Sequence, residues 1–199
     1  MLLKDSMLPL RGEVLLRVLD KDGRCLYRHH DKNSITYLAP LVLMDLMVQT
    51  DFDDDGTSIS IQGAHPADVA RGFAVAQTVV SDPQKNVVRY MRVGTGDSPA
   101  VRASVDLESP LADQESATAL ISSITFPSNS AIKFVATFAG DKANDEDPIT
   151  EVSLWTRGSA LSLDPAGTSD SRMFARQVHP PVTKTEAIML EYSWTIFLT

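Results

Sequence analysis

Apolar and polar residues alternate through much of the second half of the chain, and no other feature constrains the fold as strongly. In the segment AIKFVATFA, one face of the expected strand carries Ile132, Phe134, Ala136 and Phe138. In the final segment, MLEYSWTIFLT, one face carries Leu190, Tyr192, Trp194, Ile196 and Leu198. A period of two residues is typical of antiparallel strands that bury one face and leave the other in water.

The same reasoning predicts a series of strands over 87–93, 119–126, 131–138, 149–155, 172–178 and 187–198. Polar turn segments separate them, for example 127–130 and 164–167. Short strands divided by polar turns predict a mainly β protein. The expected architecture is an antiparallel β-sandwich or jelly-roll-like domain.

The N-terminal part of the chain predicts a β-hairpin followed by one α-helix. Val14, Leu16 and Val18 alternate on the first strand, and the second strand covers 24–30. Between them, DKDG forms a turn in which Gly23 is suited to a positive φ. Asn33 or Ser34 can then cap a helix over about 34–49. The broad apolar face of this helix packs against the sheet or against another subunit, and its interface candidates are Leu38, Leu41, Met44 and Met47.

All 199 residues are expected to form a single domain. It comprises the hairpin and helix over 1–50, a variable insertion over 51–86 and the β-sandwich core over 87–199. The one cysteine, Cys25, excludes an internal disulfide and indicates synthesis in a reducing cytoplasm. The start of the chain predicts no signal peptide, and no apolar run is long enough to predict membrane insertion.

The acidic balance of the chain limits the partners that it can bind. The sequence has 18 Lys and Arg residues against 26 Asp and Glu, which gives a formal net charge of −8. Binding of DNA across a broad surface needs a concentrated basic patch, whereas the basic residues here are scattered singly. Broad nucleic-acid binding is therefore not expected, and the acidity is interpreted as a contribution to solubility.

The stretch GTGDSP at 94–99 resembles the start of a phosphate-binding loop or of a nucleophile turn. A dinucleotide loop needs a third glycine two residues after the second, whereas Asp97-Ser98-Pro99 follows Gly96 here. An esterase turn needs a glycine two residues after Ser98, where the chain has alanine. A base for Ser98 would come from the four histidines, His29, His30, His65 and His179. The favoured interpretation is a structural turn formed by Gly94, Gly96, Asp97 and Pro99.

The remaining polar clusters give little support for a metal, a cofactor or a sugar. DFDDDGTSISIQ places Asp51, Asp53 and Asp55 like the first calcium ligands of an EF-hand, but Gln62 stands where that loop needs glutamate. A weak calcium site is a candidate there, and a solvated acidic loop is favoured. The histidines and the cysteine show no spacing typical of a metal site. Trp155 lies within a strand pattern that predicts core packing rather than sugar stacking.

Several short segments follow one another in a distinctive order along the chain. They are VGTG before Ser98-Pro99, then DLESPL, ITEVSLW, MFAR, PPVTKT and YSWTI. This order resembles a group of small structural proteins of tailed bacteriophages, in which a VGTG…P…D.AL loop precedes F…EAN..I.E.GL(F/W), (L/F)AR..F.P.ITKT and a final W.I strand. The resemblance covers about 11–50 and 87–199. Ala143 and Asn144 match the Glu-Ala-Asn of that group, with Lys142 in place of the glutamate, while 51–87 and 158–171 depart from its pattern.

The resemblance implies a virion component in the tail, neck or baseplate, or on the capsid surface. Such proteins work in multiple copies, so the implied partners are further copies of the chain and other virion proteins. No enzymatic activity and no cofactor are implied, and the expected location is the virion, after synthesis in the bacterial host cytoplasm. The last strand adds Trp194 to the interface candidates. The alternatives are a capsid decoration protein, a receptor- or carbohydrate-binding module of the virion, or a hydrolase that uses Ser98.

Overall fold

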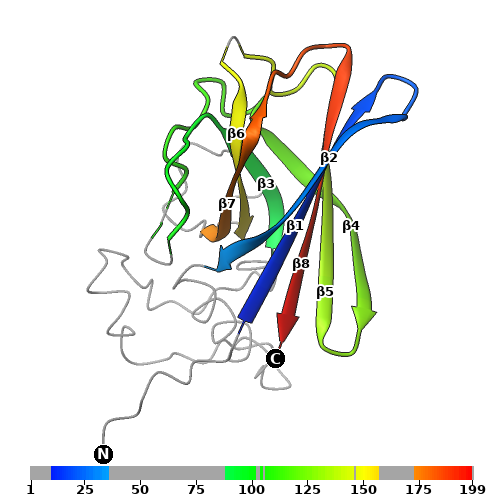
Figure 1. Cartoon of the computed structure of the whole chain (residues 1–199), viewed down its shortest axis with the longest axis vertical. Coiled ribbons are helices and arrows are strands. Elements are labelled where there is room, and N and C mark those ends of the chain that lie inside the picture. Colours follow the sequence, from blue (N-terminus) through cyan, green and yellow to red (C-terminus); the bar gives the residue numbers. More distant parts are fainter. Residues whose placement is uncertain are drawn as a thin grey trace, which may run out of the picture.

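Eight antiparallel strands form the regular structure of the computed structural model, which describes residues 10–35, 88–101, 104, 106–145, 147–156 and 173–198 (Figure 1). They are β1 (Leu10–Asp20), β2 (Cys25–Ile35), β3 (Val88–Gly94), β4 (Thr118–Ser128), β5 (Ala131–Phe138), β6 (Ile149–Thr156), β7 (Met173–Val182) and β8 (Ile188–Leu198). The prediction of a mainly β protein is confirmed, and every strand predicted after the middle of the chain overlaps an observed one. In the described part of the chain, no helix is long and apolar enough to cross a membrane.

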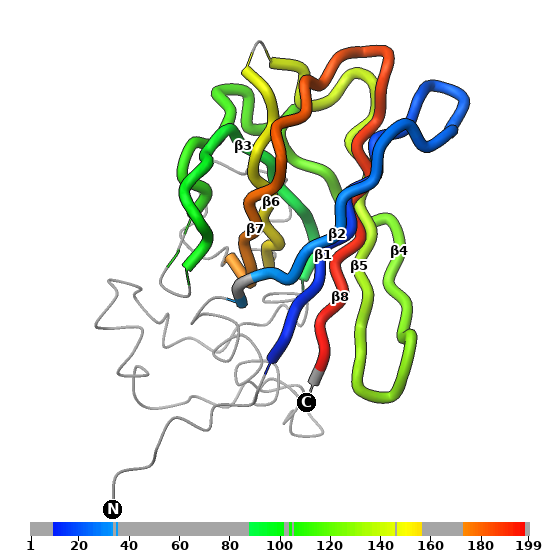
Figure 2. The backbone as a smooth tube through the Cα atoms, in the orientation of Figure 1, coloured from blue at the N-terminus to red at the C-terminus, as the bar shows by residue number. Residues whose placement is uncertain are grey.

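The strands follow one another around a single nearly closed barrel, in the order β1-β2-β7-β6-β3-β4-β5-β8, and β8 pairs with β1 (Figure 2). Two strands turn the corners of this barrel. β2 pairs with β1 as far as Asn33 and then with β7 at Ser34 and Ile35. β4 pairs with β3 over 118–120 and with β5 from Ile121 onward. These two bent strands join the part of the barrel formed by β1, β8 and β5 to the part formed by β7, β6 and β3. The expected sandwich of two separate sheets is therefore corrected to one continuous sheet.

The N-terminal hairpin is confirmed, but its second strand is longer than expected. Gly23 has a φ of 80°, and the Asp20 carboxylate accepts hydrogen bonds from the N–H groups of Asp22 and Arg24 at 2.9 and 2.8 Å. β2 continues to Ile35. The prediction that a helix begins at about residue 34 is therefore wrong at its first two residues, because Ser34 pairs with β7. The rest of that helix, with Leu38, Leu41, Met44 and Met47, lies outside the described residues, as does the insertion over 51–86.

The barrel interior is filled by the alternating residues that the sequence singled out. Those from β1, β5 and β8 are Val14, Leu16, Val18, Phe134, Ala136, Phe138, Leu190, Tyr192, Trp194 and Ile196, and they pack with buried residues of the other strands. Trp194 has no exposed surface, and its register partners Val14 and Phe134 are also buried. Trp194 is therefore corrected from an interface candidate to a core residue. Burial of one such side chain stabilises the fold by roughly 2 kcal/mol.

Candidate functional site

A buried carboxylate on β6 organises the loops at one end of the barrel. Glu151 has 0% exposed surface. Its Oε1 accepts hydrogen bonds from the backbone N–H of Gly96 at 3.1 Å and of Ser109 at 2.9 Å. Its Oε2 accepts from the backbone N–H of Glu108 at 3.1 Å and from Nε of Arg176 at 2.7 Å. Each carboxylate oxygen is thus satisfied twice, which a buried charge requires.

The network continues from Glu151 to the protein surface. Arg176 on β7 is 4% exposed, and its second contact is from Nη2 to Oε2 of Glu108 at 3.3 Å. Glu108 also accepts hydrogen bonds from the hydroxyl and the backbone N–H of Ser98. These bonds from Ser98, together with the charge of Arg176, lower the pKa of Glu108. The chain of contacts joins the loop after β3, the segment around Glu108, β6 and β7, and we call it the Glu151 network.

The Glu151 network explains why glycines follow β3. A Cβ on Gly94 would lie 2.5 Å from the carbonyl oxygen of Ser109 and 2.6 Å from Oε1 of Glu151. A Cβ on Gly96 would lie 2.5 Å from Cβ of Glu108. Among the described glycines only Gly23 has a positive φ. The glycines of GTGDSP are therefore required for close approach, rather than for the unusual backbone angles that a turn implied.

The polar residues of GTGDSP also act differently from the expectation. Asp97 and Pro99 lie on the exposed surface of the loop. Ser98 does not hydrogen-bond to its own turn but to the Glu108 carboxylate, and the Thr150 hydroxyl donates to the carbonyl of Gly96 at 2.8 Å. Side chains from other segments therefore hold this loop in place. The turn is built by tertiary contacts, where the sequence had predicted local ones.

Replacing Gly94 by Val is expected to lower the free energy of unfolding by about 2 kcal/mol and to reduce soluble yield, because the new side chain displaces Ser109 or Glu151. Urea denaturation measures the effect. Gly23→Ala is the matched control, since nothing lies within 4 Å of its Cβ position and only the positive φ is strained. Gly23→Ala should lower the free energy of unfolding by about 1 kcal/mol. If Gly94→Val lowered the free energy of unfolding by no more than Gly23→Ala does, the close-approach explanation would be contradicted.

A second buried cation fixes the loop between β5 and β6. Lys184, which follows β7, is almost fully buried. Its Nζ donates to the carbonyl of Gly140 at 3.2 Å, to Oδ1 of Asn144 at 3.2 Å and to the carbonyl of Thr185 at 3.0 Å. Burial lowers the pKa of Lys184. Three acceptors match the three donors of the ammonium group, so this lysine acts as a structural tie.

Among the described residues, Ser98 has no histidine partner that could act as its base. Its hydroxyl donates to Glu108, and no histidine is among its hydrogen-bond partners in the described part of the chain. Both ring nitrogens of His179 are occupied, Nδ1 by the carbonyl of Pro180 at 2.8 Å and Nε2 by the hydroxyl of Tyr192 at 2.9 Å. His65 lies outside the described residues.

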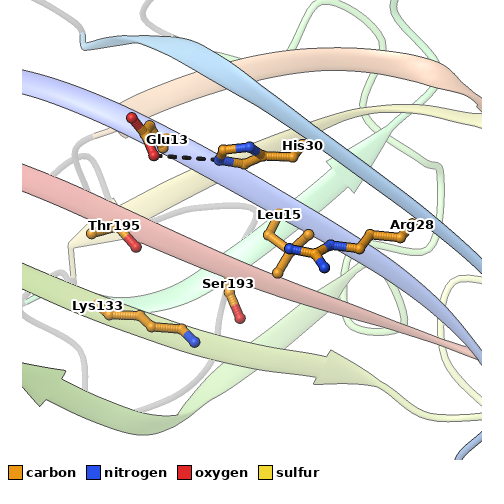
Figure 3. Close-up of a pocket in the computed structure, with 7 residues that line it drawn as sticks. All are labelled: Glu13, Leu15, Arg28, His30, Lys133, Ser193 and Thr195. Atoms are coloured by element: carbon orange, nitrogen blue, oxygen red, sulfur yellow. Dashed lines mark ion pairs between the residues drawn. The ribbon is translucent and has the colours of Figure 1, made fainter. Parts of the chain in front are cut away.

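A shallow polar depression lies on the outer face of β2, β1, β8 and β5 and has a volume of about 130 Å³ (Figure 3). Arg28 and Lys133 stand on its two sides, with Ser193 on the strand β8 between them. His30 lies 3.3 Å from the carboxylate of Glu13, and Leu15 and Thr195 complete the lining. The lining has no Phe, Tyr or Trp ring on which a sugar could stack.

No three His, Cys, Asp or Glu side chains within the described ranges lie close enough to hold a metal ion. The calcium candidates Asp51, Asp53 and Asp55 lie outside those ranges.

Sequence reasoning missed Glu151, Arg176 and Lys184. The available signal was a charged residue inside an otherwise apolar strand, since ITEVSLW carries one acid and MFAR one base. Comparison with protein-family models, with curated proteins and with solved structures gives no match to this chain.

Proposed function

We propose that the chain is a bacteriophage virion structural protein, which assembles in multiple copies through protein–protein contacts in the tail, neck or baseplate. The observation that carries this proposal is the spatial convergence of the segments that resemble phage structural proteins. VGTG supplies Gly94 and Gly96, DLESPL supplies Glu108, ITEVSLW supplies Glu151 and MFAR supplies Arg176. These segments lie far apart in the chain and meet in one hydrogen-bonded network.

The last part of the resemblance converges in the same way. Lys184 of PPVTKT binds Asn144, which stands at the position of the Glu-Ala-Asn of the phage group. A chance similarity of short segments gives no reason for their polar residues to be partners in space. Segments that together build a buried polar frame do have to occur together, because half of such a network is unstable without the other half. The convergence therefore supports a common fold with the phage group.

The topology supports a jelly-roll-like description of that fold. Strands equally far from the two ends of the chain pair with each other, as β1 with β8, β2 with β7, β3 with β6 and β4 with β5. A long hairpin folded back on itself gives this nested pairing, and jelly rolls of viral capsid proteins are built in this way. Of the other four pairs of the ring, β1 with β2, β3 with β4 and β6 with β7 join strands that follow one another in the chain, and β5 pairs with β8.

Fractionation of purified particles tests the proposed function. Particles of the phage that encodes the chain are separated into heads and tails, and each fraction is probed with an antibody raised against the purified protein. We expect the protein in the tail fraction, which includes the neck and baseplate. Its presence only in heads would point to the capsid decoration alternative, and its absence from both fractions would overturn the proposal.

A further inference from the structure

The hairpin of β4 and β5 carries an open strand edge. β4 pairs with β5 along most of its length, but its pairing with β3 is limited to Thr118, Ala119 and Leu120. From Ile121 to Ser128, no strand of the described chain pairs with the second edge of β4. Figure 1 shows this part of the hairpin projecting beyond β3 at the lower right. The backbone groups along such an edge are available to another strand.

Large apolar side chains are exposed along the same strand. Of the large apolar residues that are exposed in the described chain, Leu120, Ile124 and Phe126 lie on β4. Phe126 is the most exposed, at 75%, and Ile124 is 45% exposed. Ile124 pairs with Phe134, whose side chain is buried in the barrel, so the apolar inner surface continues onto the hairpin and is uncovered there. Exposed apolar side chains along an unpaired strand edge favour pairing with another chain.

The charge pattern of β4 sets it apart from the other open edge. The run 116–132 contains no Asp, Glu, Lys or Arg, and it is the longest such run in the chain. Among the described residues, β2 also has an open edge over most of its length, since it pairs with β7 only at Ser34 and Ile35. That edge carries charged residues, which include Arg28, Asp31 and Lys32. Charges on an edge strand block pairing with other chains, so they protect β2, whereas no charge protects β4 between Ser123 and Thr125.

We propose that β4 is the surface through which two copies of this chain associate, with each β4 pairing antiparallel to its counterpart across a two-fold axis. This inference rests on the proposed function, because it names the contact by which multiple copies assemble. The net charge of −8 on each copy opposes contact through the charged faces, so the uncharged edge of β4 is where a second copy can approach without placing like charges opposite each other. Two-fold symmetry brings the same patch of each copy together.

The sequence of β4 also limits where the contact is centred. Pro127 has no N–H to donate, and the register with β5 shifts between Thr125 and Ser128, so the ladder ends there. The register with β5 also shifts between Ile121 and Ser123, so the pairing centres on Ser123 to Thr125, with Ile124 at the axis and Phe126 covering the partner strand. The five-stranded half of the barrel, β2-β1-β8-β5-β4, continues through this contact into the second copy.

Sedimentation velocity of the purified protein tests the contact. We expect a dimer that dissociates on dilution, and Ile124→Lys should shift it to the monomer, because two lysines then meet at the axis. Leu26→Lys is the matched control, since Leu26 is 61% exposed on the open edge of β2. This variant should remain dimeric. A wild-type monomer at every concentration, or loss of the dimer in Leu26→Lys, overturns the proposal.

Cysteine cross-linking keeps the proposal testable if Ile124→Lys fails to fold. In a Cys25→Ser background, single cysteines at the exposed positions Ser122, Ser123 and Thr125 should give disulfide-linked dimers under mild oxidation at one or more positions. Paired residues of antiparallel strands lie within the span of a disulfide. The wild-type protein reports on the other edge, because Cys25 is exposed on β2. Dimers linked through Cys25 without any through β4 would contradict the inference.

These measurements use the isolated protein, so they are independent of particle fractionation. A protein that is found in tails but does not dimerise through β4 retains the proposed function and loses this contact. A protein that dimerises through β4 but is absent from particles keeps the contact and loses the proposed function.

Discussion

Replacing Glu151 by Gln is expected to lower the free energy of unfolding by roughly 3–5 kcal/mol, because it removes one partner of a buried ion pair. Each oxygen of the Glu151 carboxylate accepts two N–H groups. Glutamine places an NH₂ group where one of these oxygens stands, so donors face donors whichever way the amide is turned. Arg176 is then left as a buried charge without its partner on β6. Urea denaturation followed by tryptophan fluorescence measures the loss.

Glu191→Gln provides the matched control. Glu191 also pairs with an arginine, Arg17, but this pair lies on the outer face of β8 and β1, where water screens it. Loss of this ion pair should lower the free energy of unfolding by less than about 1 kcal/mol. If Glu191→Gln and Glu151→Gln destabilised the protein equally, the Glu151 network would not be the structural frame described above.

The free energy of unfolding is expected to rise by roughly 3 kcal/mol as pH increases from about 4 to 6.5, because of His179. Burial lowers the pKa of His179 from 6.5 to about 4. Between these values the unfolded chain binds a proton that the folded chain does not, so acid favours unfolding. The hydrogen bonds fit a neutral ring, in which Nδ1–H donates to Pro180 and Nε2 accepts from Tyr192. Burial also raises the pKa of Tyr192, so its hydroxyl stays protonated.

Denaturation curves at a series of pH values, repeated on two variants, isolate this effect. His179→Gln should flatten the dependence between pH 4 and 6.5, since glutamine does not titrate. His30→Gln changes an exposed histidine on the outer face and should keep the wild-type slope. An unchanged slope in His179→Gln would show that other groups cause the acid sensitivity.

The strands were predictable from the sequence because half-buried antiparallel strands encode burial in every second residue. β5 and β8 show this most clearly, since every second residue from Phe134 to Phe138 and from Leu190 to Ile196 lies in the core, whereas Lys133 and Thr137 do not. The turn at Gly23 was predictable for a similar reason, because the backbone angle depends on local residues. Local patterns thus determined which elements form and which faces they bury.

The closure of the barrel and the buried network could not be predicted in this way. The corner in β2 depends on Ser34 and Ile35 pairing with β7, which is distant in the chain, so a local helix cap was the wrong interpretation of Ser34. The role of Gly94 depends on Glu151, which approaches it from another strand. The alternation around Trp194 predicted that its side chain is buried, but not whether it is buried within one chain or between two. The register, which pairs Trp194 with Val14 and Phe134 of the same chain, shows that it is buried within one chain.

The most direct test of the central claim is a count of copies in the virion. Particles are purified through successive density gradients, and peptides of the chain are quantified by mass spectrometry against isotope-labelled standards, relative to the major capsid protein. The account predicts several copies per particle, constant through purification. A ratio below one copy per particle, or one that falls with each gradient, would contradict a structural role in the virion.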